Sequence, residues 1–383
     1  MNQEEKNENQ ELFVKQQIIP EETSKRITAL RFLLAMLVVF IHNNYTIKGI
    51  TESVEKGSPN IIFNPNIISE WIQRFISQGI ARCAVPLFFL FAAYLQSKKF
   101  DSYLLLLKKK FKGLVIPYVI WVGLYLLCFS LVKVIVVKIA PSLFGNPSAT
   151  MFEWSKMDWL HKIIGYGVDG QGLPEAAAQF WFVRDLVILV FISPIIYFFM
   201  KSCKVGFIVL ISISYILCIK IYFVSTEGLF FYVLGLYWGY FNFDLFKQID
   251  KIKLFESILV FFLCFIGTHT IYGEESVIGN FMHISACIIL LKISKELVLN
   301  KRLYNLASYF AGYSFFLYAI HMPVLNESLR RVWLHYFPMK NAFFCLFEYF
   351  GVTILTIVIG TSIGILLKKV CPPLFVVLNG GRR

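Results

Sequence analysis

The chain has 383 residues, of which 57% are hydrophobic, 17% are aromatic and only 16% are charged, and its mean hydropathy is +0.65. A soluble protein of this length carries more charge, whereas repeated apolar stretches of about 20 residues fit hydrocarbon about 30 Å thick. The net charge of +13 could indicate a nucleic-acid partner, but the basic residues form short clusters between apolar stretches, as membrane topology requires. The composition therefore excludes a nucleic-acid-binding protein and predicts an all-α, polytopic membrane helix bundle.

Three regions are expected along the chain. Residues 1–24 are acidic and amide-rich, which predicts a disordered cytoplasmic tail. A membrane domain follows over 25–371, and 372–383 form a short cytoplasmic tail. The eight cysteines are scattered, without a Cys-x-x-Cys pair, so no metal site and no disulfide framework is expected.

About ten apolar segments are long enough to span a bilayer. They are Ile27–Ile47, Gly79–Ser97, Leu114–Ile139, Phe180–Met200, Val205–Val224, Leu229–Phe243, Leu254–Tyr272, Val277–Leu299, Tyr309–Leu325 and Ala342–Leu367. Alternate loops carry most of the lysine and arginine, which places both termini in the cytoplasm and makes this a multi-pass protein of the cytoplasmic membrane. Arg330, Arg331 and Lys340 are exceptions on the outer side.

The first apolar helix carries two polar residues, Arg31 near its start and His42 towards its outer end. They are eleven positions apart, so both side chains leave the same face, about 16 Å apart along the axis. Ionisable residues inside a membrane helix normally point into the protein and mark a functional site. The alternatives are that Arg31 extends to the cytoplasmic headgroups and that His42 is an interfacial histidine bonded to a carbonyl.

Further polar residues fall near the outer ends of other spans, where they form either a buried ion-pair network or a site. They are Arg82, Arg184, Asp185, His321 and Glu327. Arg184 and Asp185 are adjacent, so their side chains are expected to point about 100° apart and to bond other helices. His321 precedes Met322-Pro323 and could instead cap a kink, because proline frees a carbonyl one turn back.

Together these features resemble the acyltransferase-3 family of membrane O-acyltransferases. The resemblance rests on five motifs in order over about Lys25 to Lys369: Arg31 with ten intervening residues before His42, Arg82–Leu95, Lys110–Trp121, Trp181–Leu186 and Ser314–His321. Two departures are visible. The family often has Ser-Gly where this chain has Ala92-Ala93, and often has arginines where Lys110 and Lys112 stand. Lysine keeps the charge but loses the bidentate fork of arginine.

The resemblance implies transfer of an acyl group, commonly acetyl, from cytoplasmic acyl-CoA to a hydroxyl of an extracytoplasmic or lipid-linked glycan. Lys110 and Lys112, with Arg31, would hold the CoA phosphates, and Arg82 is a further expected cofactor-binding residue. His42 would be the general base or the transient acyl acceptor. Arg184 or Arg82 would stabilise the oxyanion, and Asp185, His321 or Glu327 would orient the histidine or the acceptor.

The expected co-substrate is acetyl-CoA, with no metal, and the expected product is an O-acetylated cell-envelope polysaccharide. The acceptor could be peptidoglycan, lipopolysaccharide, exopolysaccharide or an antibiotic sugar. Because some relatives carry an extra extracytoplasmic domain that completes transfer, this chain acts alone or with a separate extracytoplasmic transferase. The competing hypothesis is a small-solute or amino-acid transporter that uses the polar stripe of the first helix, the face that carries Arg31 and His42, although the sequence has no inverted repeat. An inactive scaffold subunit is a third alternative.

Overall fold

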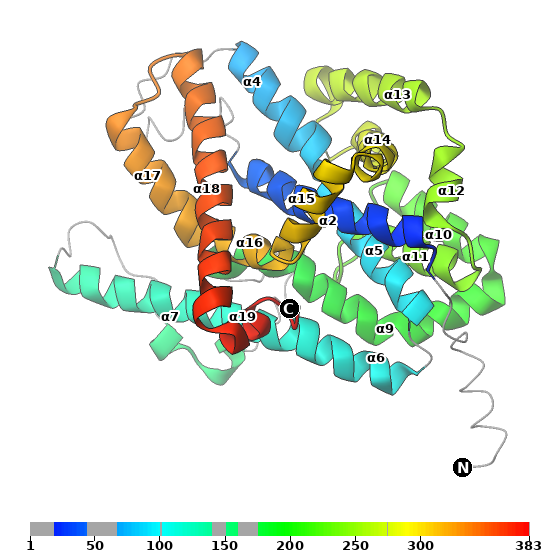
Figure 1. The fold of residues 1–383 in the computed structure, drawn as a ribbon, viewed down its shortest axis with the longest axis horizontal. Helices are drawn as coiled ribbons and strands as arrows, with labels where there is room; N and C mark the ends of the chain where they lie inside the picture. Colours follow the sequence, from blue (N-terminus) through cyan, green and yellow to red (C-terminus); the bar gives the residue numbers. More distant parts are fainter. Residues whose placement is uncertain are drawn as a thin grey trace.

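The computed structural model describes residues 19–43, 67–99, 102–139, 151–159, 175–273 and 275–382. Every regular element in these residues is helical, so the predicted all-α bundle is confirmed (Figure 1). The α-helices are α2 (Glu21–His42), α4 (Ile67–Arg74), α5 (Ala84–Lys99), α6 (Tyr103–Lys110), α7 (Ile116–Ile139), α9 (Trp181–Cys203), α10 (Val205–Ile216), α11 (Thr226–Tyr240), α12 (Leu245–Asp250), α13 (Leu254–Gly267), α14 (Val277–Leu299), α15 (Lys301–Ala311), α16 (Ser314–Ile320), α17 (Asn326–Tyr336), α18 (Ala342–Val370) and α19 (Pro372–Leu378).

Short π-helical or 3-10 segments join several of these helices. They are η1 (Phe75–Ile80) and η2 (Ala81–Cys83) between α4 and α5, η3 (Phe111–Val115) between α6 and α7, η5 (Met151–Glu153), η7 (Glu175–Phe180) before α9, η8 (Thr268–Tyr272) after α13, and η9 (His321–Leu325) between α16 and α17. Single π-helical turns are frequent at functional sites. Two of them here, η3 and η9, lie beside residues that the sequence singled out.

All ten predicted segments contain helix, and six helical stretches in the described residues are long and apolar enough to cross a membrane. These six are Ile68–Lys98, Tyr103–Leu131, Ala177–Cys203, Leu254–Ile271, Val277–Leu299 and Ala342–Val370. The other four predicted segments contain shorter or more polar helices, such as the 12-residue α10. The number of crossings and the side on which each terminus lies therefore stay predictions.

Helix α2 runs through the middle of the bundle (Figure 1). It contacts α5, α14, α15, α16 and α18, which come from both halves of the chain. Most of its apolar residues are buried, among them Leu30, Leu34 and Val39. A helix that is apolar on nearly all sides is stable only when other helices surround it. This central position explains why its few polar side chains meet residues from so many elements.

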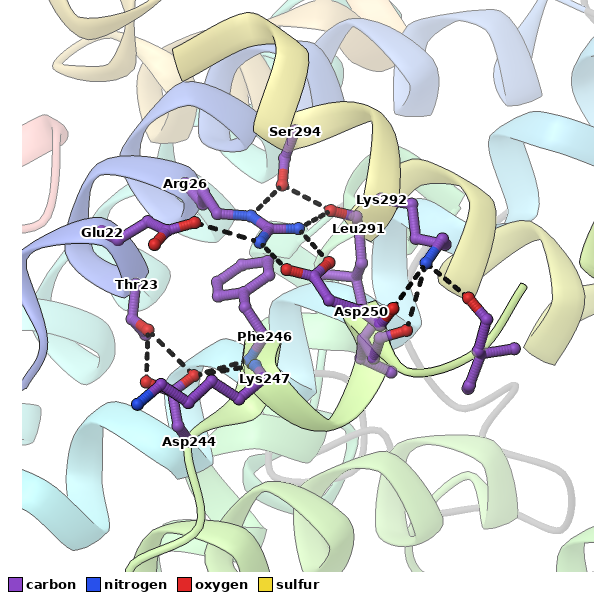
Figure 2. A network of polar contacts seen from close by, with 12 residues as sticks. Glu22, Thr23, Arg26, Asp244, Phe246, Lys247, Asp250, Leu291, Lys292 and Ser294 are labelled. Atoms are coloured by element: carbon purple, nitrogen blue, oxygen red, sulfur yellow. Dashed lines mark hydrogen bonds and ion pairs between the residues drawn. The ribbon is translucent and has the colours of Figure 1, made fainter. Parts of the chain in front are cut away.

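The first turns of α2 are fixed by Arg26, whose side chain is fully buried (Figure 2). Its guanidinium donates to both carboxylate oxygens of Asp250 in α12, at 2.7 and 3.0 Å, and to the Leu291 carbonyl and the Ser294 hydroxyl of α14, at 2.8 and 2.9 Å. It also lies 4.0 Å from the centre of the Phe246 ring. One arginine thus joins α2, α12 and α14.

A kink at His321-Met322-Pro323, which the sequence raised as an alternative reading of His321, is present in the structure. Met322 has φ −127° and ψ 158°, outside the helical region, so the helix breaks between α16 and α17. Pro323 cannot donate to the carbonyl four residues before it, that of Ala319. The Tyr125 hydroxyl of α7 donates to this carbonyl instead, at 2.9 Å. The break therefore leaves no unsatisfied carbonyl at Ala319, and it places His321 inside the bundle.

The two predicted tails lie partly within the described residues. Helix α2 begins at Glu21, and residues 1–18 of the N-terminal tail lie outside the described residues. At the other end, α19 folds back onto the bundle beside α7 (Figure 1). Phe375 is fully buried there, and the Trp121 indole donates to the Leu378 carbonyl at 2.9 Å. The segment that was expected to be a short tail is therefore packed against helices through Phe375, Leu378 and Asn379, whereas Gly381 and Arg382 are exposed.

Candidate active site

Two histidines from distant parts of the chain meet inside the bundle. His42 is the last residue of α2 and His321 opens η9, and the centres of their rings are 5.1 Å apart. His321 is completely buried and His42 is partly buried. The sequence placed both near the outer ends of their spans, but only the fold brings them into contact. This pair is the centre of the candidate site.

The hydrogen bond that His321 makes defines its tautomer. Its Nδ1 lies 2.6 Å from the Tyr318 carbonyl oxygen, which can only accept, so Nδ1 carries the proton. In a neutral imidazole the other nitrogen, Nε2, then has a free lone pair. Nε2 is buried and has no hydrogen-bond partner among the described residues. His321 therefore presents an unprotonated nitrogen in a water-poor part of the protein, as a general base requires.

A buried polar network holds the end of α2 that carries His42. The neighbouring Asn43 donates to the Tyr349 carbonyl and the Thr353 hydroxyl of α18, at 2.8 and 2.9 Å. Its amide oxygen accepts a hydrogen bond from Arg330. Arg330 in turn donates to Glu348 through Nε at 2.9 Å. Arg330, an exception to the charge bias expected of the loops, is thus buried against a carboxylate.

Arg31 lines a cavity of about 180 Å³. The cavity is lined by two further cations, Lys110 and Arg382, and by Tyr318. No acidic side chain lines it within the described part of the chain. Tyr318 also faces His321, with ring centres 6.0 Å apart. We call this the cationic cavity; one tyrosine separates it from the histidines.

A second, larger cavity of about 490 Å³ is lined by Arg82, Trp181, Arg184, Asp185, Glu227 and Asn280. We call it the polar cavity. Arg82, which lines it, also interacts electrostatically with His42. The start of α9 separates the two cavities, because Phe182 and Val183 line the first and Arg184 and Asp185 line the second. The histidine pair thus has a neighbour in each cavity.

Arg184 and Asp185 were expected to bond other helices, and Asp185 does so, because its Oδ2 accepts from the amide of Ser225, the N-cap residue of α11, at 2.8 Å. The two residues also bond each other, with Arg184 Nε and Nη2 at 2.9 and 2.7 Å from Asp185 Oδ1. The Asp185 carboxylate therefore bonds both the Arg184 guanidinium and the Ser225 amide, from its place in the first turn of α9.

The remaining predicted residues are Arg82, Lys112 and Glu327. Arg82 lines the polar cavity and donates to Gln78 at 2.7 Å, so it does not join Lys110. Lys112 is exposed. Glu327 is partly exposed and lies 3.7 Å from Arg330. In the described residues, neither Asp185 nor Glu327 bonds to a histidine, and His321 is the residue whose ring lies beside that of His42.

Several residues of the site were not expected from the sequence. They are Asn43, Arg330, Glu348 and Arg382, and the Asn43–Arg330 contact, for example, joins residues 287 positions apart. Glu348 was the one with a detectable signal, as a carboxylate inside the last apolar span. In the described residues, no three His, Cys, Asp or Glu side chains are placed to hold a metal ion.

Helices of this length and apolarity, with arginine and histidine buried between them, define a polytopic membrane protein with an intramembrane polar site. The sequence profile of the acyltransferase-3 family, described as an acyltransferase domain, matches residues 24–367. The chain belongs to this family and is a membrane acyltransferase. No curated protein and no solved structure matches the chain.

Proposed function

We propose that the protein transfers an acetyl group from cytoplasmic acetyl-CoA to a hydroxyl of an extracytoplasmic or lipid-linked glycan, in the cytoplasmic membrane. The observations that carry the proposal are the His42–His321 pair, the cationic cavity to which Tyr318 links it, and the polar cavity lined by Arg82 and Arg184. A donor with phosphates and an acceptor with hydroxyls need different surroundings. The two cavities differ in this way, one lined by cations and the other by mixed polar groups.

The cationic cavity suits the donor. Arg31 and Lys110 provide two positive charges, and a charged phosphate forms shorter and stronger hydrogen bonds with such groups than a neutral ligand does. Arg31 has no hydrogen-bond or ion-pair partner among the described residues, so its donors are available. The acyl end of the donor then lies beside Tyr318, next to the histidines.

The polar cavity suits the acceptor. Its volume lies within the roughly 300–1,000 Å³ range of small-molecule sites. Trp181 offers an aromatic face, and Asp185, Glu227 and Asn280 offer groups that bond hydroxyls. A sugar presents both an apolar face and several hydroxyls, so this lining favours a glycan over an apolar alcohol.

The chemical step needs one base and one oxyanion stabiliser. An imidazole of the histidine pair removes the proton of the acceptor hydroxyl, and the hydroxyl oxygen attacks the thioester carbonyl carbon. Arg82 or Arg184 stabilises the oxyanion that forms. The carbon–sulfur bond then breaks, the CoA thiolate takes the proton from the imidazolium, and the ester leaves with the acceptor. In the two-step variant, His42 carries the acyl group before the hydroxyl attacks.

The test uses the purified protein in liposomes with radiolabelled acetyl-CoA and a cell-envelope extract. Wild type should move label into glycan, whereas His42→Ala and Arg31→Ala should not, although both remain folded. His335→Ala is the matched control, because His335 is an exposed histidine of α17 outside both cavities. If wild type leaves acetyl-CoA intact and instead moves solutes across the membrane, the polar stripe is a permeation path and the proposal is wrong.

A further inference from the structure

The last described residues, Cys371 to Arg382, form a folded segment that we call the C-terminal strap. Its anchor is Asn379, which is fully buried. The Asn379 side chain accepts from the Phe316 amide at 3.1 Å and donates to the Gly312 carbonyl at 2.7 Å. Both bonds join the strap to the start of α16. Because α16 also carries Tyr318, the strap has a defined position relative to the histidine site.

Two glycines turn the strap towards the cationic cavity. Gly380 and Gly381 have φ of +69° and +76°, a conformation that other residues rarely adopt. Gly380 also approaches η3 closely, since a β-carbon there would lie 2.6 Å from the Gly113 carbonyl oxygen. Only glycine fits at this contact. The turn is thus built into the sequence, and the residue that follows it, Arg382, lines the cavity.

Arg382 follows this turn and lines the cavity with Arg31 and Lys110. Its guanidinium lies 5.1 Å from the centre of the Phe315 ring, and its Nη1 donates to the Asn379 carbonyl at 3.3 Å. These contacts orient the guanidinium but leave it no carboxylate partner among the residues lining the cavity. Arg31 and Arg382 interact as like charges, so a bound anion would relieve their repulsion.

We propose that Arg382 is a phosphate-binding residue for the acyl donor, brought to the cavity by the C-terminal strap. The inference rests on the proposed function and adds to it a residue that lies beyond the matched 24–367 region. Lys110 provides charge without the planar fork of arginine. Arg382, beside it, provides that fork, which matches two phosphate oxygens at once.

The test measures binding rather than turnover. Wild type, Arg382→Ala and Arg382→Lys are purified in phosphatidylcholine nanodiscs, and titration calorimetry gives the Kd for CoA and for pantetheine, which has no phosphate. We expect Arg382→Ala to weaken CoA binding about tenfold or more, the usual effect of a lost hydrogen bond to a charged group. The Kd of Arg382→Lys for CoA should lie between those of wild type and Arg382→Ala. The Kd for pantetheine should be the same for all three proteins.

Lys369→Ala is the matched control, because Lys369 is an exposed cation at the end of α18, outside the cavity lining. Arg382→Gln replaces Arg382→Ala if the latter does not fold. The proposal is overturned if wild type binds no CoA, if the variants bind CoA as wild type does, or if pantetheine binding falls equally.

Phosphate could also reach this cavity as a lipid headgroup. The same titrations in nanodiscs with phosphatidylglycerol separate the sources, because an Arg382 effect confined to anionic lipid would overturn the proposal. If wild type binds CoA in an Arg382-dependent way but transfers no acetyl group, the phosphate site stands and the proposed transfer reaction fails.

Discussion

The nitrogen Nε2 of His321 is the group whose role is easiest to isolate. We predict that His321→Ala lowers kcat for acetyl transfer by about 10²–10⁴-fold, the usual contribution of general base catalysis. Because His321 is absent from the lining of the cationic cavity, the Kd for CoA should not change. Free imidazole added to the variant should restore part of the rate. Unchanged kcat in the folded variant would show that His42 works without it.

A second prediction concerns the buried pair of Arg330 and Glu348, which supports Asn43. Glu348→Gln removes the buried carboxylate that accepts from Arg330 Nε, while Glu327 stays 3.7 Å away, so it should destabilise the protein by roughly 3 kcal/mol, the lower end for a broken buried pair. The double variant Arg330→Met, Glu348→Leu should recover the melting temperature, because apolar replacements of a buried pair are often neutral. The kcat of this double variant should be lower than that of wild type, because Asn43 no longer accepts a hydrogen bond from Arg330. Recovery of both stability and kcat would contradict a positioning role.

At the scale of single residues, the sequence indicated most of the polar side chains of the site but not their partners. Arg31, His42 and His321 were identifiable because charge or imidazole inside an apolar run requires a reason. Arg382 was not, because an arginine near a chain end looks like an ordinary loop cation. Helical periodicity gives the face on which a side chain lies, but not which other helix meets that face.

Among the elements, α12 gives a prediction for pH. The Arg26 hydrogen bonds hold the pKa of the Asp250 carboxyl below its ordinary value of 3.8. A carboxyl whose pKa is lowered by folding contributes stability above its unfolded pKa and loses that contribution as pH falls through the folded pKa. Asp250→Asn should therefore lower the melting temperature at pH 7. The difference from wild type should shrink below about pH 4.

The matched control for this pH series is Glu21→Gln, which breaks an ion pair with Lys25 at the exposed start of α2. Exposed pairs of this kind contribute little, so the melting temperature should stay the same at every pH. Scanning fluorimetry in detergent gives both curves. A difference between Asp250→Asn and wild type that persists unchanged at pH 3 would assign the stabilisation to packing of α12 instead of to the charge.

Helix existence was the most predictable property of the fold, because runs of apolar residues specify it directly. Val277–Leu299 was predicted with the same bounds that α14 has. The segment Tyr309–Leu325 was predicted as one span but contains the end of α15, α16 and the break at Met322. The proline indicated that break. The folded state of the strap had no such indication, because its short apolar stretch buries Phe375 only against distant helices.

For the molecule as a whole, the charge bias predicts which loops face the cytoplasm. Cys203 ends α9 beside the lysines of an expected cytoplasmic loop, and Cys218 follows α10 on the expected outer side; both are exposed. In single-cysteine variants on intact cells, a membrane-impermeant maleimide should label Cys218 and leave Cys203 unlabelled until the cells are opened. The reverse pattern would invert the bundle and place the polar cavity in the cytoplasm.

One consequence follows from the fact that α2 carries both Arg31 and His42. Because both residues belong to one helix, their separation along its axis is set at about 16 Å. This separation selects donors by length. A donor is used only if its anionic group and its reactive carbonyl are separated by a linker that covers this distance. Acetyl phosphate, in which the acetyl group is bonded directly to phosphate, is too short to occupy both ends. The enzyme should therefore reject it, even though its acetyl group is chemically activated.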